Sequence, residues 1–254
     1  MQYDVIIIGA GPGGIFSAYE LSKLCPDKKI AVFEEGQPLE KRRCPIDGKT
    51  VKHCIGCPTC AIMNGFGGAG AFSDGKYNLT NDFGGTLYEY IGKKQAMELM
   101  HYVDEINVSH GGENTKLYST ANSAFKTRCL QCGLHLLDAS VRHLGTDVNL
   151  VVLSNLYDLL KDKVDFYFDS PVTTIAREGE GYRVTVGETD YAASNDENSS
   201  TNVMALCAAQ DGGVWLLEQT YTYAAPEASA DDETAAEADE NSADDYGYTP
   251  SESQ

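Results

Sequence analysis

The sequence predicts an α/β fold with a parallel β-sheet. Two short segments, Val5–Ile8 and Ile30–Phe33, are apolar and rich in β-branched residues, as expected of parallel strands that are buried on both faces. Residues 12–24, between them, place apolar side chains at helical spacing, and Pro26 prevents the helix from continuing. A strand, a helix and a second strand in this order form a βαβ unit, from which parallel sheets are built.

Further elements are expected C-terminal to this unit. Apolar residues at helical spacing predict helices over 93–108, near 122–140 and over 147–162, the last with Asp147 at or near its start. Strands are expected over 164–168, 172–175 and 182–186, and the last two would belong to a β-meander. Weaker apolar segments follow at 203–207 and 214–217. Residues 37–83 are rich in Gly, Cys and Pro without a sustained period, so we expect a long loop or small insertion there.

The negative charge is concentrated near the C-terminus. The 254 residues have a formal net charge of −19, and residues 184–254 hold 16 of the 38 acidic residues but none of the 19 Lys and Arg. From Pro226 onward the chain has ten acidic residues and no base, a composition that cannot bury enough apolar surface to fold. We therefore expect one domain over 1–218, which includes the insertion at 37–83, and a disordered acidic tail over 219–254.

Charge and hydropathy also exclude classes of partner. The acidic balance repels nucleic acid and anionic lipid, so neither is an expected partner. No segment reaches the ~18–20 consecutive apolar residues of a membrane span. The N-terminus lacks the positively charged region of a secretory signal, and eight Cys without an export signal are typical of a reducing compartment. These features predict a cytoplasmic protein.

The turn between the first strand and the first helix carries a nucleotide-binding motif. Residues 9–14 fit G-x-G-x-x-G, and Glu34 follows Gly14 by 20 residues, at the end of the next strand. Gly9 permits the tight turn, Gly11 lets a pyrophosphate approach the backbone, and Gly14 lets the helix pack on the strand. Glu34 would accept two ribose hydroxyls. The motif predicts a Rossmann-like FAD/NAD(P)-binding domain, with a ligand-free Gly-rich turn as the alternative, and its spacing does not separate FAD from NAD.

A second glycine-rich segment, residues 65–76, closely resembles the second flavin-contacting loop of a bacterial family described as uncharacterised FAD-dependent dehydrogenases. The resemblance continues through 40–45, 60–63 and 141–147 and covers about residues 1–190. It implies FAD as the cofactor; a flexible linker is the alternative interpretation of the segment. The residues that it implies as cofactor contacts are Arg42, Gly67, Gly68, Ala69 and Ser73, together with the backbone of Val172 beside the adenine.

The resemblance leaves two functions open. One is an FAD-dependent, dehydrogenase-like oxidoreductase that passes hydride or electrons between NAD(P)H and an unknown small-molecule substrate. Members of the family have a substrate region and a further flavin-contacting Gly-Asp segment after the meander, which this sequence does not show. The other function is therefore a non-catalytic FAD-binding fragment, whose substrate lobe a partner chain would supply.

Four cysteines suggest a third function. Cys44, Cys54, Cys57 and Cys60 lie within 17 residues, and two-residue spacers let successive sulfurs face one metal centre. An iron–sulfur cluster near a flavin would transfer electrons, whereas zinc would pin the loop, giving a metal-pinned thiol protein. Unliganded packing or a redox-active C-x-x-C pair are the alternatives.

Arg142 and His143 are the candidate catalytic residues. They precede the helix expected at 147, in a segment expected to be a loop. His143 could transfer protons near the flavin, or hold an anionic substrate beside Arg142, or simply bond to the backbone. Lys76 could neutralise charge on a reduced flavin or be solvated.

Overall fold

The computed structural model describes residues 1–121, 123–179, 181–193, 206–208 and 214–216. All of them belong to one compact unit, Met1–Gln219. The acidic tail expected over 219–254 lies outside the described residues.

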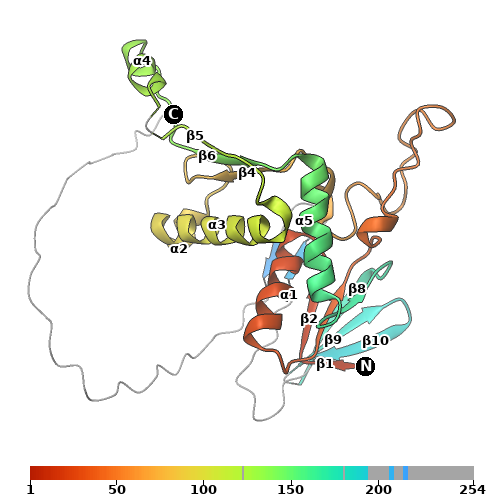
Figure 1. Cartoon of the computed structure of the whole chain (residues 1–254). Coiled ribbons are helices and arrows are strands. Elements are labelled where there is room, and N and C mark those ends of the chain that lie inside the picture. The colour runs from red at the N-terminus through yellow and green to blue at the C-terminus, as the bar shows by residue number, and fades with distance from the viewer. Residues whose placement is uncertain (122, 180, 194–205, 209–213, 217–254) are drawn as a thin grey trace, which may run out of the picture. The chain divides into compact units, whose positions relative to one another are not determined.

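The first sheet consists of three parallel strands in the order β2-β3-β7. Figure 1 labels β2, its first strand. Strand β2 (Val5–Ile8) pairs with β3 (Ile30–Phe33), which pairs with β7 (Asp165–Tyr167). Helix α1 (Pro12–Leu24) connects β2 to β3. The predicted α/β class and its βαβ unit are confirmed, with the same bounds for all three elements.

The second sheet, in the order β1-β10-β9-β8, contains the predicted meander. Strands β8 (Val172–Glu178), β9 (Gly181–Val186) and β10 (Thr189–Ala193) are antiparallel to their neighbours, and β1 (Gln2–Tyr3) pairs with β10 in parallel. The sequence does not predict β10, because Thr189 and Asp190 interrupt its apolar pattern.

The third sheet differs from the expectation. It is antiparallel and its order is β4-β6-β5, with β4 at Lys76–Leu79, β6 at Ser140–His143 and β5 at Leu117–Ser119. The helix expected near 122–140 is confined to α4 (Phe125–Gln131). The segment expected to be a loop, 37–83, contains β4 and two short 3-10 helices, Leu39–Lys41 and Gly68–Phe72.

The remaining elements are mostly helical. Helix α2 (Leu87–Ile91) precedes α3 (Lys93–Asn107), which continues into a π-helical turn at Val108–Gly112. Helix α5 (Gly145–Leu160) begins two residues before the expected start, and Asp147 lies in its first turn, near the cap residue Leu144, as expected. Strands β11 (Leu206–Ala208) and β12 (Val214–Leu216) pair with each other. No helix among the described residues combines the length and apolarity needed to cross a bilayer.

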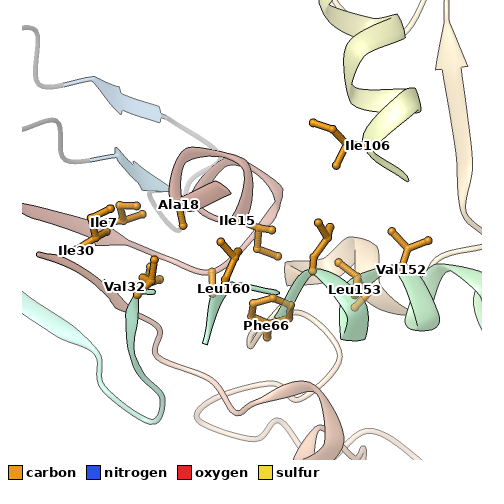
Figure 2. Packing of buried hydrophobic residues seen from close by; sticks show 14 of the residues in the cluster. Ile7, Ile15, Ala18, Ile30, Val32, Phe66, Ile106, Val152, Leu153 and Leu160 are labelled. Carbon is orange, nitrogen blue, oxygen red and sulfur yellow. The ribbon is translucent and has the colours of Figure 1, made fainter. Parts of the chain in front are cut away.

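The two faces of the parallel sheet are buried against different layers. Ile7 packs with Ile15 of α1 and Leu160 of α5 in the larger core cluster (Figure 2). Ile6, the next residue of the same strand, packs on the opposite face with Val184 of the meander. This burial on both faces explains why β2 and β3 are apolar throughout.

Candidate functional site

The first glycine loop, residues 9–14, joins β2 to α1. Gly9 has a φ of +92°, and a Cβ at position 14 would lie 1.9 Å from the carbonyl oxygen of Gly9. Both positions therefore require glycine. A Cβ at Gly11 would meet nothing within 4 Å, so this part of the loop faces open space at the N-terminus of α1. Free N–H groups and the positive end of the helix dipole make that position suitable for a phosphate.

The second glycine loop, residues 65–73 of the predicted segment 65–76, packs directly on the first. The N–H of Gly67 donates to the carbonyl oxygen of Ala10 at 2.8 Å. A Cβ at Gly68 would lie 3.2 Å from Cα of Gly11. Gly65, Gly67 and Gly68 all have positive φ, which other residues rarely adopt. The fold thus places the two sequence-predicted loops side by side.

Glu34 connects the two loops. One carboxylate oxygen accepts the N–H of Ala10 at 2.7 Å, and the other accepts the N–H groups of Gly36 and Gly65, both at 2.8 Å. The side chain is buried. Because a carboxylate offers about four lone-pair positions, about one remains for a further donor. Accepting two ribose hydroxyls, as the motif predicts, would require one of these backbone bonds to be released.

Arg42 holds the second loop through backbone carbonyls. It is buried, and its guanidinium donates to the carbonyl oxygens of Ala61, Ile62, Phe66 and Gly68 at 2.7 to 2.9 Å. Burial lowers the pKa of Arg42 because it disfavours the charged form. The resemblance implies Arg42 as a cofactor contact, whereas two of these bonds support the loop itself, at Phe66 and Gly68, and the other two support the residues just before it.

Asn149 anchors the end of the same loop to α5. Its Nδ2 donates to the carbonyl oxygens of Gly70 and Ala71, and its Oδ1 accepts the hydroxyl of Tyr77 at 2.7 Å. Burial raises the pKa of Tyr77. The sequence analysis did not identify Asn149, although it is a polar residue on the apolar stripe of α5, three residues before Val152.

The remaining predicted contacts lie around the two loops. Ala69 and Ser73 are exposed, and the Ser73 hydroxyl donates to the carbonyl oxygen of Gly70. Val172 begins β8, just after Ser170, whose N–H donates to the carbonyl oxygen of Glu34 at 2.9 Å. The structure therefore brings the start of the meander to the same end of β3 as the carboxylate.

Arg142 and His143 lie on strand β6, which corrects the expected loop. Arg142 forms a bidentate ion pair with Asp104 of α3, at 2.5 and 2.8 Å, and also donates to the carbonyl oxygen of Thr115. The hydrogen bond to Asp104 raises the pKa of Arg142. His143 is exposed and lies opposite Lys76 in the β4–β6 pairing. The ammonium of Lys76 pairs with Asp74 at 2.7 Å, and this bond lowers the pKa of Asp74.

The four clustered cysteines do not converge on one centre. Cys54 is exposed, and Cys44, Cys57 and Cys60 are half-buried free thiols. Within the part of the chain that the structure describes, no group of three or more His, Cys, Asp or Glu side chains could hold a metal ion. The prediction of zinc or an iron–sulfur cluster therefore gains no support from the geometry.

Comparison with known proteins gives only distant likenesses. No family model matches the sequence, and no curated protein matches it. Among solved structures, glycine oxidase from Geobacillus kaustophilus is 16% identical with a TM-score of 0.42, over 76% of this chain and 53% of that protein. A flavoprotein/dehydrogenase from Cytophaga hutchinsonii is 14% identical with a TM-score of 0.37, over 76% of this chain and 37% of that protein. CtdE, solved in complex with FAD, is 13% identical with a TM-score of 0.36, over 76% of this chain and 36% of CtdE. The chain thus spans about half of the oxidase and just over a third of the other two.

Proposed function

We propose that the chain binds FAD at the two glycine loops and acts as an FAD-dependent oxidoreductase. The observation that best supports this proposal is the contact between the loops, because Gly67 bonds to Ala10 and Glu34 bonds to both loops. A glycine-rich turn without a ligand would not need a second glycine loop packed against it.

Each part of the site has a role in this proposal. Gly11 and the N-terminus of α1 would accommodate the pyrophosphate, and the open space at Gly11 fits such a group. Glu34 would accept a ribose hydroxyl with its remaining lone pair, and the backbone of Val172 would meet the adenine. Gly67, Gly68, Ala69 and Ser73 would face the flavin end, and Arg42 would act on the cofactor by positioning this loop.

FAD would supply hydride or electron transfer, and the protein would supply binding and orientation. NADH or NADPH is the proposed donor, and the substrate is not specified by any described residue. His143 is the proposed proton donor, because it is exposed on β6 and pairs with Lys76, the first residue of β4, which follows the second loop.

A graded series at Gly11 tests the cofactor site. Gly11→Ala should fold normally, because a Cβ there meets no neighbour. Both Gly11→Ala and Gly11→Val should keep a phosphate from the backbone N–H groups, the valine more completely. Losing one charge-assisted hydrogen bond costs about 1.5–3 kcal/mol, or roughly one to two decades of affinity for the alanine variant. The valine variant should retain no FAD. Affinity is measured by fluorescence titration and folding by circular dichroism.

Gly187→Asn is the matched control. It lies in the β9–β10 turn with a φ of +59°, which Asn tolerates, and a Cβ there also meets nothing within 4 Å. Unchanged FAD binding in Gly11→Val would refute the cofactor site. If the chain binds FAD but neither NADH nor NADPH reduces it, with any acceptor of a broad panel, the non-catalytic alternative is favoured.

A further inference from the structure

Two cysteines lie three residues apart at the end of helix α4. Cys129 is in the helix and Cys132 is the residue that caps it, and both are free thiols in the structure. Residues i and i+3 of an α-helix lie on the same face, with their Cβ atoms about 5–6 Å apart. A disulfide requires a Cβ–Cβ distance of about 3.5–4.5 Å. The two cysteines therefore have to approach by only about 1–2 Å to form a bond.

The backbone at the end of α4 keeps the pair together without a disulfide. The N–H of Gly133 donates to the carbonyl oxygen of Leu130 at 3.0 Å, and the N–H of Leu134 donates to that of Cys129 at 2.8 Å. These two bonds form a Schellman motif, and Gly133 has the positive φ that the motif requires, +71°. Cys132 itself departs from helical geometry, with φ −95° and ψ 10°. A rotation at this capping residue can bring its sulfur closer to Cys129 without unwinding the helix.

The pair is accessible to a small molecule. Cys132 is exposed and Cys129 is half-buried. Five of the seven residues of α4 are exposed and none of them is buried, so no packed core opposes a small movement of its last turn. A reagent in solution therefore meets Cys132 first, and Cys129 has to reach only the sulfur of its neighbour.

The charge around α4 favours an anionic reagent. Residues 116–137 hold three Lys and Arg residues and no Asp or Glu, in a chain whose net charge is −19. Lys126 is paired with Asp138, whereas the guanidinium of Arg128 lies 5.8 Å from the ring centroid of Phe125. A local excess of positive charge raises the concentration of anions near the surface. Thiol–disulfide exchange with a small anionic disulfide fits this environment.

We propose that Cys129 and Cys132 form a reversible dithiol–disulfide site, which a small anionic disulfide such as glutathione disulfide oxidises. The thiolate of Cys132 attacks one sulfur of the small disulfide, which forms a mixed disulfide and releases one thiol. The thiolate of Cys129 then attacks the sulfur of Cys132, which forms the internal disulfide and releases the second thiol. The dithiol loses two electrons and two protons, and both pass to the two released thiols. No step requires FAD, so this inference is independent of the proposed function.

Equilibration of the full-length chain with glutathione tests the proposal. Trypsin cleaves after Arg128 and Arg142, so the peptide 129–142 carries both cysteines and no other. In this peptide, the ratio of internal to mixed disulfide equals the effective concentration of the Cys129 thiol divided by the concentration of reduced glutathione. Because short linkers give effective concentrations of about 1 mM, we expect a roughly tenfold excess of the internal disulfide with about 0.1 mM reduced and about 1 mM oxidised glutathione. Acid quenching, alkylation of the unfolded chain and mass spectrometry measure the ratio.

Moving the second thiol by one residue tests the geometry. Gln131→Cys combined with Cys132→Ser keeps an exposed thiol near the end of α4 but places it two residues from Cys129, where helical side chains do not face each other. The excess of internal disulfide should be lost in this variant. Cys129→Ser should instead accumulate the mixed disulfide at Cys132. Cys54→Ser is the matched control, because it removes an exposed thiol outside α4, and it should keep the excess.

Three results would overturn the proposal. The first is a wild-type peptide 129–142 that is mainly the mixed disulfide or the dithiol at equilibrium. The second is an undiminished excess of internal disulfide in the variant with the moved thiol. The third is an internal disulfide that an excess of reduced glutathione does not reopen. If FAD does not bind but the internal disulfide forms and reopens, the proposed function fails and this inference stands.

Discussion

Arg42→Ala should destabilise the second glycine loop and weaken FAD binding only through that loop. The buried guanidinium donates to four carbonyl oxygens of residues 61–68, and its bond to Phe66 is fully buried. No other side chain described in the structure holds this stretch through so many backbone groups. The variant therefore removes support from the middle of the loop and leaves both of its ends attached.

The size of the effect follows from the burial of each bond. Leaving the buried Phe66 carbonyl unpaired costs about 1–3 kcal/mol, and each of the three partly exposed carbonyls loses about 0.5–1 kcal/mol when it turns to water. Removing the guanidinium also returns part of the cost of burying it. We expect a net loss of about 2–5 kcal/mol in the free energy of unfolding, against the ~5–15 kcal/mol of a typical domain.

Urea denaturation of the flavin-free chain measures this loss, and fluorescence titration measures FAD affinity. Arg42→Lys should lie between the wild type and alanine, because an ammonium reaches fewer carbonyls than the guanidinium fork. Arg43→Ala is the control, since Arg43 is adjacent in sequence but exposed. If Arg42→Ala keeps the full unfolding free energy but loses FAD, Arg42 contacts the cofactor directly and the loop-support reasoning is refuted.

Two other side chains give independent predictions. Glu34→Gln places an amide NH₂ against backbone N–H donors, so the flavin-free chain should lose about 1–3 kcal/mol of unfolding free energy. The affinity for FAD should also fall. A fall in affinity without a change in the urea denaturation curve would mean that Glu34 acts on the ribose alone. The side chains of Arg142 and Asp104 are only 12% and 9% exposed, so Arg142→Met leaves Asp104 buried and unpaired. This variant should lose about 3–5 kcal/mol of unfolding free energy. Arg142→Met combined with Asp104→Leu should cost less than the sum of the single variants by urea denaturation, and additive losses would show that the pair is not coupled.

The sequence was sufficient to predict those strands and helices whose structure is decided by a local pattern of residues. Strands β2 and β3 are apolar throughout because both of their faces are covered, and helix α1 begins and ends at glycine and proline signals. Strands β4 and β5 could not be predicted in this way. They are three or four residues long and are stabilised by pairing with β6, which is more than twenty residues away along the chain.

The same distinction applies to the site. The first glycine loop satisfies a spacing rule, so its position and its glycines could be inferred, and the second loop was found by resemblance. The partners of Glu34 could not be inferred, because Ala10 and Gly65 lie 24 and 31 residues away. For the same reason the ion pair of Arg142, beside which a substrate was expected, could not be inferred, because its partner Asp104 lies 38 residues earlier.

These long-range bonds bear on how a cofactor would be bound. Glu34 holds the start of the second glycine loop, Arg42 its middle and Asn149 its end, and each does so through backbone groups. Ordering a flexible residue costs about 1–2 kcal/mol, and glycine has the most freedom to lose. Because the three side chains already order the loop in the folded chain, FAD would not have to supply that free energy on binding. The residues that limit affinity would then include these three supports as well as those in contact with the cofactor.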